Sequence, residues 1–366
     1  MYVGWIELAG FRGYTSLSFA PDPGLNALLG PNGHGKTSLL EGLHVLLTGR
    51  SFRTSRLAEC IGWDAAGTTA IAGEIREGEQ SRVVRLAIEP GARAGEIRGG
   101  LCPWARAVSF QATDLTLVHG EPQGRRVYLD EAVARLVPAH RETCRRYRLT
   151  LHQRTRLLGD LVGRAEATRL LDPWDEQLAT LGSEIVHRRL EGLAILAAEA
   201  QAIREALMPA GGALALTYEG SVKPGADMSA TRAALLAALV AARSRDLRRG
   251  LTLVGPHRDD VVIRLGRGDA RVTASRGEQR SLTLLLRLAE AAAVRRRLGT
   301  TPVFLLDDLL SEFDRPARTR VLTWLRDQGQ VLFSGMDPGV EAEGVVRWEV
   351  RNAEVGVADA LARGAA

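Results

Sequence analysis

Cysteine, histidine clusters and long apolar runs are scarce in this chain of 366 residues, and each scarcity excludes a class of protein. The three cysteines, Cys60, Cys102 and Cys144, lie far apart with no C-x-x-C pair, so we expect neither a disulfide framework nor a zinc site. The seven histidines are scattered, which removes the usual metal patterns. The longest uncharged apolar run, Ala233–Ala242, is too short for a bilayer crossing of about 20 residues.

We expect no targeting signal in the first residues of the sequence. Met1–Gly10 contains Glu7 and has no basic start, so it does not resemble a signal peptide, and we expect the protein in the cytoplasm. Hydrophobic residues make up 45% and charged residues 25%, which excludes a mainly disordered chain. The length predicts two to three domains.

Lysine is almost absent. Lys36 and Lys223 are the only lysines among 48 basic residues, and the net charge is +5. The planar guanidinium of arginine matches phosphate oxygens, so the composition suits a phosphate-binding protein. Charge alone does not decide whether the partner is a nucleic acid.

Alternating and continuous apolar runs predict strands near both ends of the chain. In the N-terminal part we expect strands at Tyr2–Leu8, Gly24–Leu29, Thr69–Ile75, Val83–Ile88 and Ala107–Phe110, with a hairpin turn at Arg76–Ser81. Later strands are expected at Leu251–Val254, Val261–Leu265 and near Val303, Val331 and Val346, with helices near Glu278 and Pro316.

Between these parts the sequence is rich in Ala, Leu, Arg and Glu from Gln123 to about Arg249, which predicts several helices. We therefore expect an α/β fold in which one domain, residues 1–116 and 251–366, is interrupted by an all-helical insertion, residues 117–250. The insertion has no sustained heptads, so a long coiled coil is not expected.

A phosphate-binding loop is the most specific motif. Residues 30–37, Gly-Pro-Asn-Gly-His-Gly-Lys-Thr, match G-x-x-x-x-G-K-[ST] at every fixed position, after a predicted strand and before a predicted helix. Backbone N–H groups of such a loop bind phosphate oxygens, Lys36 neutralises the β- and γ-phosphates, and the Thr37 hydroxyl coordinates Mg²⁺. The alternative is a chance match, expected in roughly one chain of this length in a hundred. The expected nucleotide contacts of the loop are Gly30, Pro31, Asn32, Gly33, His34, Gly35, Lys36, Thr37 and Ser38.

An acidic strand completes this prediction. The apolar run Val303–Leu306 ends in Asp307 and Asp308, where a P-loop enzyme places its Mg²⁺ carboxylate. We expect Asp307 on the metal and Asp308 orienting the attacking water. By itself, the pattern could also be a strand followed by a capped turn.

Further motifs resemble the ABC ATPases, and most specifically their SMC-like branch. Their order along the chain is the P-loop, Gln111 after a strand, a helical insertion, Ser-Arg-Gly-Glu-Gln at 275–279, the acidic strand and Ser-Glu-Phe-Asp at 311–314. Within that branch the chain resembles the RecF family of bacterial recombination and replication-repair proteins. The stretches that resemble it are residues 11–14, 125–130, 153–158, 174–178, 255–260 and 306–312, spread over most of the chain.

This resemblance implies a two-lobed ABC-type ATPase with a mixed sheet that dimerises head to tail on ATP. Each nucleotide would lie between the P-loop of one subunit and the signature of the other, where Ser275, Gly277 and Gln279 would contact it in trans. Ser275 at the start of a helix can also simply cap that helix, and both roles need the same geometry. Gln111 would sense Mg²⁺ and water, although surface glutamines are common. Arg12 would reach the phosphates, or would form an ion pair at a strand end.

Two departures from the general ABC pattern predict slow hydrolysis. Asp308 stands where many ABC ATPases have a glutamate, one methylene longer, and Ser334 and its neighbours replace a histidine after the next strand. Both changes affect the positioning of the water, which depends on geometry. We therefore expect a switch whose turnover stays below roughly 10 per second.

A basic helix face is the candidate DNA contact. Arg141, Arg145, Arg148 and Arg156, with His152, follow i, i+3 and i+4 spacing. Further basic clusters in the insertion are Arg125, Arg126, Arg188, Arg189, Arg243, Arg245, Arg248 and Arg249. These stripes can bind phosphates without base recognition, but an arginine-rich solvated face has the same pattern. No aromatic residues are interleaved, which favours double-stranded, gapped or junction DNA over a pure single strand.

The resemblance implies an ATP-switched DNA clamp that works with RecR, and in one pathway with RecO and RecA, in recombination, replication and the SOS response. Two other classes share the phosphate chemistry. The nucleotide-binding subunit of a membrane transporter is disfavoured by the arginine-rich insertion and by residues 255–260. An SMC-type scaffold needs longer coiled-coil arms than this insertion provides.

Overall fold

Both ends of the chain contribute to one unit of the computed structural model. Met1–Leu115 and Glu290–Ala366 form this first unit, and Thr116–Ala289 forms the second. The sequence predicts a boundary at residue 250, whereas residues 251–289 group here with the second unit. The structure describes residues 1–62, 67–91, 97–161, 165–208, 212–308, 313, 315–336 and 344–357.

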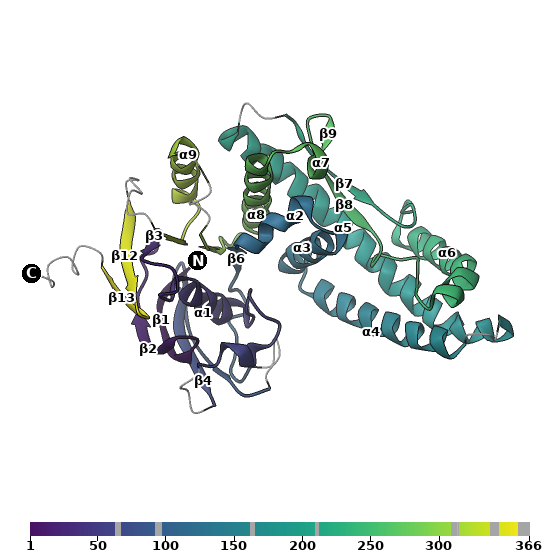
Figure 1. Ribbon diagram of the computed structural model, residues 1–366, viewed down its shortest axis with the longest axis horizontal. Helices are drawn as coiled ribbons and strands as arrows, with labels where there is room; N and C mark the ends of the chain where they lie inside the picture. Colours follow the sequence, from purple (N-terminus) through teal and green to yellow (C-terminus); the bar gives the residue numbers. More distant parts are fainter. Residues whose placement is uncertain are drawn as a thin grey trace, which may run out of the picture. The chain divides into compact units, whose positions relative to one another are not determined.

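A six-stranded mixed sheet organises the first unit (Figure 1). Its order is β13 (Glu354–Val357), β12 (Val345–Arg351), β3 (Leu25–Leu29), β11 (Val331–Gly335), β10 (Val303–Leu306) and β6 (Ala107–Phe110). All these strands are parallel except β13. Every residue of β3 is buried, as its continuous apolar sequence requires in the middle of a parallel sheet. The carboxyl ends of β3, β6, β10 and β11 therefore meet at one edge.

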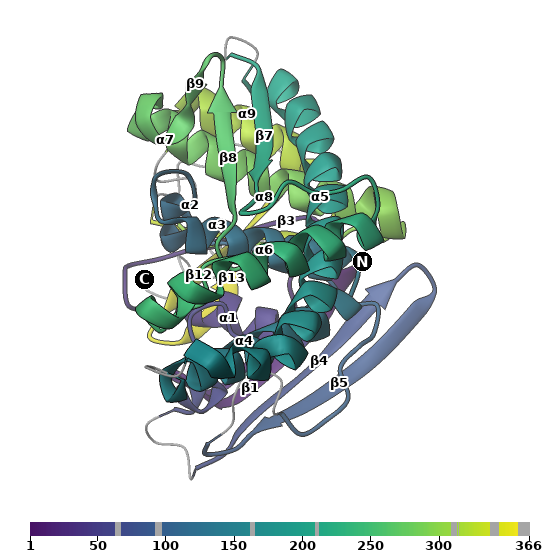
Figure 2. The same ribbon diagram turned by 90° about the vertical axis from the view of Figure 1, so that its right-hand side faces the viewer.

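An antiparallel sheet lies on the other side of helix α1 (Lys36–Thr48). Its order is β2 (Tyr14–Phe19), β1 (Tyr2–Phe11), β4 (Thr69–Glu77) and β5 (Gln80–Ile88). The predicted hairpin is confirmed, with a tighter turn, and Figure 2 shows β4 and β5 as one long ribbon. Apolar residues of α1 pack against both sheets, whereas α9 (Arg315–Arg326) lies on the opposite face of the six-stranded sheet (Figure 1). Short 3₁₀ turns occur at η1 (Leu57–Cys60) and η2 (Ala112–Leu115).

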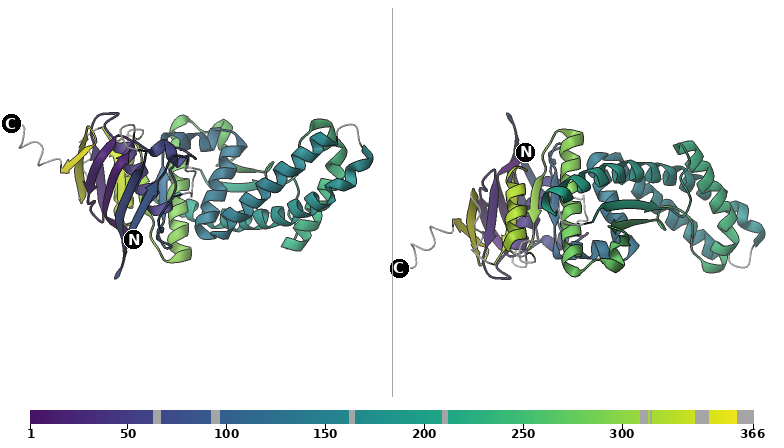
Figure 3. Two further views of the ribbon diagram at one scale, coloured as in Figure 1. Left: turned by 90° about the horizontal axis from the view of Figure 1, so that it is seen from below. Right: turned by 90° about the horizontal axis from the view of Figure 1, so that it is seen from above.

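Helices dominate the second unit, as predicted. They are α2 (Thr116–His119), α3 (Pro122–Leu136), α4 (Ala139–Asp160), η3 (Ala165–Leu171), α5 (Asp172–Leu207), α6 (Met228–Arg249) and α7 (Ala270–Thr273). Helix α8 (Arg276–Leu298) begins in this unit and ends in the first. The long helix α5 packs against α4 and α6, as Figure 3 shows. In the part of the chain that the structure describes, no helix is both long and apolar enough for a membrane crossing.

The second unit also contains a sheet, which differs from the all-helical insertion expected from the sequence. Strand β7 (Leu214–Glu219) pairs with β8 (Asp260–Leu265), which pairs with β9 (Gly268–Asp269). The strand predicted at Leu251–Val254 is wrong. Side chains satisfy that segment instead: the N–H of Leu253 donates to Asp246, and the Thr252 hydroxyl accepts from Arg154. Its short apolar run belongs to a loop in which Thr252 and Val254 are buried and Leu251 is exposed.

Candidate nucleotide-binding site

The loop between β3 and α1 has a backbone that only glycine tolerates at key points. Gly30 has φ of 148° and Gly35 has φ of 111°. A Cβ on Gly30 would collide with the carbonyl oxygen of Val350 in β12, and one on Gly35 would lie 2.7 Å from the Tyr14 hydroxyl. The two glycines therefore let β12 and Tyr14 hold the loop at close range.

The rest of the loop is open to a ligand. Pro31, Asn32 and Gly33 are exposed, while Ser38 is half-buried in the first turn of α1. His34 is tied to the β12–β13 turn, because its Nδ1 accepts a hydrogen bond from the N–H of Asn352 at 3.1 Å. The first N–H groups of α1 have no partner within the helix and form a natural anion site.

Lys36 is the first residue of α1 and is 8% exposed. Its Nζ donates to the carbonyl oxygens of Gly30 at 2.5 Å and Pro31 at 2.8 Å. Burial lowers the pKa of Lys36, and the charges of Asp308 and Asp307 partly oppose that shift. The ammonium group of Lys36 is thus held close to the backbone of the loop that is predicted to bind phosphate.

Thr37 and Asp307 meet, as the two motifs predict. The Thr37 hydroxyl lies 2.9 Å from each carboxylate oxygen of Asp307. Ser334, on the neighbouring strand β11, donates a second hydrogen bond to Asp307 Oδ1 at 2.7 Å. These contacts orient a carboxylate and a hydroxyl towards one another beside Lys36.

Asp308 follows in a left-handed backbone conformation, with φ of 51°. Its N–H donates to the Ser334 hydroxyl at 2.8 Å, so one serine fixes both aspartates. In the sequence, Ser334 is visible only as the absence of a histidine. Its role depends on the β10–β11 pairing, which no local pattern reveals.

Gln111 directly follows β6, next to β10. The pairing of Phe110 with Leu306 places Gln111 and Asp307 at neighbouring strand ends, and the Asp307 N–H donates to the Phe110 carbonyl. The Gln111 carboxamide, however, donates to the carbonyl oxygen of Phe52 at 3.2 Å. Gln111 therefore lies at the edge formed by the carboxyl ends of the parallel strands, as predicted. Its side-chain amide is hydrogen-bonded to the loop that follows α1.

Arg12 forms the ion pair that was the alternative to phosphate binding. Its Nε and one terminal nitrogen donate to the two carboxylate oxygens of Glu41, at 2.9 and 2.7 Å, and its other terminal nitrogen donates to the Glu59 carbonyl. Burial raises the pKa of Glu41, but the bonds from Arg12 and Ser51 outweigh it and bring the pKa below its ordinary value. Neither Glu41 nor Tyr14 was expected at the site: Glu41 belongs to no motif, and Tyr14 was noted only within residues 11–14, a stretch that resembles the family.

The predicted trans contacts lie in the second unit, at the start of α8. Ser275 and Glu278 form a reciprocal cap: the Ser275 N–H and hydroxyl each donate to Glu278 Oε2 at 2.8 Å, and the Glu278 N–H donates back at 3.3 Å. Gln279 donates to the carbonyl of Ala274 at 3.0 Å, and nothing lies within 4 Å of a Cβ added to Gly277. The capping role of Ser275 is therefore present in the structure. Ser311, Glu312, Asp314 and Asp337 lie outside the described residues.

The arginines of the second unit divide into two groups. Arg125 and Arg189 are buried and paired with Asp260 and Asp130, and Arg243 pairs with Asp172 and Asp175, so these members of the predicted basic clusters hold the unit together. On α4, Arg145 pairs with its neighbour Glu142, and Arg156 is exposed. Arg141 pairs with Glu131 and, like Arg148, lines a pocket.

The donor set fits a magnesium nucleotide. Mg²⁺ prefers oxygen ligands, which the Thr37 hydroxyl and Asp307 carboxylate offer at one point. Lys36 donates to the neutral carbonyls of the loop, so its charge is available to phosphate oxygens. The loop, the lysine and the acid thus offer the groups that a polyphosphate and its cation require.

Comparison with known proteins agrees with this geometry. The family model described as "AAA domain" matches residues 6–119. A curated relative from Heliobacterium modesticaldum, named DNA replication and repair protein RecF, is 37% identical over 91% of this chain and 91% of its own length.

Two solved structures extend the likeness to the fold. One, described as the recombination mediator protein RecF-ATP in RecFOR pathway, has a TM-score of 0.84 at 26% identity and covers 97% of this chain and 99% of its own. The other, an Smc head bound to the C-winged helix domain of ScpA, has a TM-score of 0.54 at 15% identity, covering 98% of this chain and 97% of its own. This second likeness shows the fold alone: an ABC-type ATPase head.

Proposed function

Because the chain belongs to the RecF family of DNA replication and repair proteins, we propose that it is an ATP-switched DNA-binding protein of recombinational repair and replication restart. The convergence of Thr37 and Asp307 beside Lys36 is the observation that supports this most strongly.

Each residue of the site has a distinct part in this proposal. The loop N–H groups and Lys36 bind the β- and γ-phosphates, and Thr37 and Asp307 hold the cation. Mg²⁺, when bound, stabilises negative charge on the phosphates. Asp308 orients the attacking water with Gln111, whose amide must leave the Phe52 carbonyl to do so. Ser334 holds both aspartates in position through hydrogen bonds to the Asp307 carboxylate and the Asp308 N–H.

The second half of the site comes from another copy of the chain. Ser275, with Gly277 and Gln279, binds the γ-phosphate of the partner's nucleotide at the N-terminus of α8. The reciprocal cap places the Ser275 hydroxyl at the start of α8, and the γ-phosphate replaces the Glu278 carboxylate as its acceptor. ATP favours the dimer through this contact, and hydrolysis removes it. Slow hydrolysis, weakly stimulated by DNA, then resets the clamp.

DNA binds to the basic face of α4 in this account. Substitutions of Arg145 and Arg156 test DNA binding most cleanly, because Arg141 and Arg148 also line a pocket and could have a second role. Phosphate contacts of this kind position a duplex or a gapped junction without reading its sequence. RecR is the direct partner, and RecO and RecA act in the same pathway, where the complex helps RecA loading and SOS induction.

Fluorescence anisotropy of a labelled duplex tests the proposed function, with and without ATP and Mg²⁺. The two lysines of the chain provide a matched pair: Lys36→Met removes the phosphate contact, whereas Lys223→Met changes a residue outside the site. ATP should strengthen duplex binding in the wild type and in Lys223→Met, but not in Lys36→Met. Equal ATP stimulation of all three proteins, or no stimulation of any, would contradict the proposal.

A further inference from the structure

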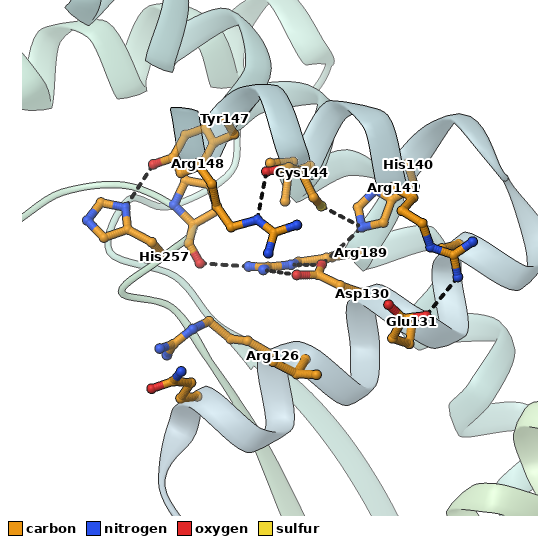
Figure 4. Close-up of a pocket in the computed structure, with 15 residues that line it drawn as sticks. Arg126, Asp130, Glu131, His140, Arg141, Cys144, Tyr147, Arg148, Arg189 and His257 are labelled. Carbon is orange, nitrogen blue, oxygen red and sulfur yellow. Dashed lines mark hydrogen bonds and ion pairs between the residues drawn. The ribbon is translucent and has the colours of Figure 1, made fainter. Parts of the chain in front are cut away.

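A pocket of about 300 Å³ opens in the second unit, lined from α3, α4, α5 and the loop before β8. Figure 4 shows its charged residues, with Arg148 entering from α4 and Arg126 from α3, and the Asp130–Arg189 pair between these helices. None of the residues assigned above to the nucleotide lines this pocket. Its chemistry therefore calls for a separate explanation.

The pocket has more positive than negative charge. Its lining includes four arginines and two carboxylates. Arg189 donates to both oxygens of Asp130 at 2.8 Å, and Arg141 pairs with Glu131 at 2.7 Å. In the described parts of the chain, Arg126 and Arg148 have only backbone acceptors, the carbonyls of Asp259 and Cys144. Two guanidinium groups thus face one hollow without a carboxylate partner.

The environment of Arg126 agrees with this imbalance. Burial and the charge of Arg189 lower the pKa of Arg126, against the opposing charges of Asp260, Asp259 and Asp130. His257 adds no compensating charge, because burial lowers its pKa to about 4 and leaves it neutral at pH 7. An anion entering between Arg126 and Arg148 would therefore meet favourable charge.

Apolar side chains also line the pocket. Tyr147 and Ile185 are buried at 3% and 2% exposure, and Val127 at the rim is 55% exposed. An exposed valine beside two arginines offers contact to something larger than a free inorganic ion. The matching ligand has a negative group next to an apolar one.

A metal ion is a poorer match for the same pocket. Asp130, His140 and Cys144 bring their ligand atoms within 4.8 Å of one another. Both oxygens of Asp130 are already bonded to Arg189, and burial raises the pKa of the Cys144 thiol to about 12, which disfavours the thiolate that a metal requires. Displacing a bidentate ion pair would offset much of the gain from binding a cation.

We propose that this pocket binds a short acidic segment of a partner protein, in which a carboxylate lies next to an apolar side chain. Arg126 and Arg148 bind the carboxylate, and Val127, Tyr147 and Ile185 contact the apolar group. A duplex presents its phosphates on a convex surface and suits an exposed helix face better than a hollow of this size. The inference goes beyond the ATP-dependent function and does not rest on it.

Selection from a displayed library of random heptapeptides against the full chain tests this proposal. Enriched peptides, made with a fluorophore, are measured by anisotropy against four proteins: wild type, Arg126→Gln/Arg148→Gln, Val127→Ser and Arg145→Gln. Arg145 is the matched control, because it lies on the same helix but does not line the pocket. Circular dichroism verifies the fold of each variant.

The selected peptides should contain Asp or Glu beside an aliphatic or aromatic residue. Loss of two charge-assisted bonds should weaken binding about tenfold or more in the double variant, with a smaller loss for Val127→Ser and none for Arg145→Gln. A peptide with Gln in place of its acidic residue should lose affinity for the wild type to the same extent, which tests the charge without altering the protein.

Several results would overturn the proposal. These are a selection without acidic residues, equal binding to the double variant, and equal binding of the Gln peptide. A labelled duplex that displaces the peptide and itself loses affinity in the double variant would assign these arginines to DNA. If the double variant does not fold, the affinity of the Gln peptide for the wild-type protein decides whether the acidic residue is required.

Discussion

The Thr37 hydroxyl lies 2.9 Å from both carboxylate oxygens of Asp307, although 270 positions separate the two residues in the chain. Pairing between the carboxyl ends of parallel strands brings this about: β3 leads into the loop before Thr37, and β10 leads into Asp307, with β11 between them. The contact joins the two motifs that define the nucleotide site. Both motifs were found from sequence, and their meeting depends on the sheet.

Replacing Asp307 with Asn should separate folding from catalysis. The carboxamide oxygen of the substituted side chain could still accept hydrogen bonds from Thr37 and Ser334, so the fold should persist. The substitution removes the negative charge with which residue 307 would bind the cation. We expect ATP hydrolysis to fall roughly 100-fold. Phosphate release measures the rate, and a thermal melt provides the structural control. Unchanged hydrolysis would remove Asp307 from the metal site.

Substitutions at Asp308 test whether the length of its acidic side chain limits the rate of ATP hydrolysis. Asp308→Glu adds the methylene that many ABC ATPases have, and hydrolysis should become several-fold faster from a wild-type value below roughly 10 per second. Asp308→Asn should abolish turnover and keep ATP binding. If the wild type is faster than this limit, or if Asp308→Asn hydrolyses ATP normally, the proposed timing switch is wrong.

Ser334 should act through the two aspartates. Ser334→Ala removes the hydroxyl that donates to Asp307 and accepts from the Asp308 N–H. We expect a stability loss of about 1 kcal/mol and a greater loss in kcat than in ATP affinity. Ser334→Thr keeps the hydroxyl and should restore much of the rate. Equal kinetics for Ala and Thr would show that the hydroxyl does not position the acids.

The stability of the second unit should depend on pH through His257. Its Nε2 donates to the Thr252 carbonyl and its Nδ1 accepts from Tyr147, so the neutral ring is hydrogen-bonded at both nitrogens in its buried position. Burial lowers its pKa from 6.5 to about 4. Between these values the unfolded chain binds a proton that the folded chain does not, so stability falls as pH falls.

The His257 contribution amounts to about 2 kcal/mol between pH 7.5 and pH 5. Denaturant unfolding at both pH values measures it, and His257→Gln should reduce the difference by about that amount. The variant keeps a side chain that can donate to Thr252 but does not titrate. An unchanged pH dependence in His257→Gln would contradict the assignment.

Two arginines of α4, two positions apart, should behave in opposite ways. Arg154 is fully buried and pairs with Asp175 and Asp246, whereas Arg156 is exposed. Arg154→Met leaves the buried carboxylate of Asp246 without its arginine and Asp175 with Arg243 alone, and should cost about 3 to 5 kcal/mol. Arg156→Met should leave stability unchanged and reduce the salt dependence of duplex binding by about one unit of slope. Comparable unfolding midpoints would contradict the structural role of Arg154.

Features that depend on residues close together in the sequence could be predicted, whereas features that depend on contacts between distant residues could not. The P-loop and the acidic strand were recognisable because spacing alone specifies them, and short apolar runs located many of the strands but not β2 or β7. Arg125 and Arg189 were placed in basic clusters because their acidic partners, Asp260 and Asp130, are invisible to composition. Leu251–Val254 has the sequence of a strand, but Asp246 and Arg154 satisfy the polar groups of this segment. Ser334, Glu41 and Tyr14 act only through strand pairing and packing.

The composite nucleotide site is the central claim, and molar mass by light scattering tests it most directly. Wild type, Lys36→Met and Ser275→Arg are measured with and without ATP and Mg²⁺, in the presence and absence of a short duplex. The mass of the wild type should double with ATP and increase further with the duplex. Ser275→Arg should bind ATP and remain a monomer, and Lys36→Met should remain a monomer because it does not bind ATP. A wild type that stays monomeric, or a Ser275→Arg protein that still dimerises, would contradict the account.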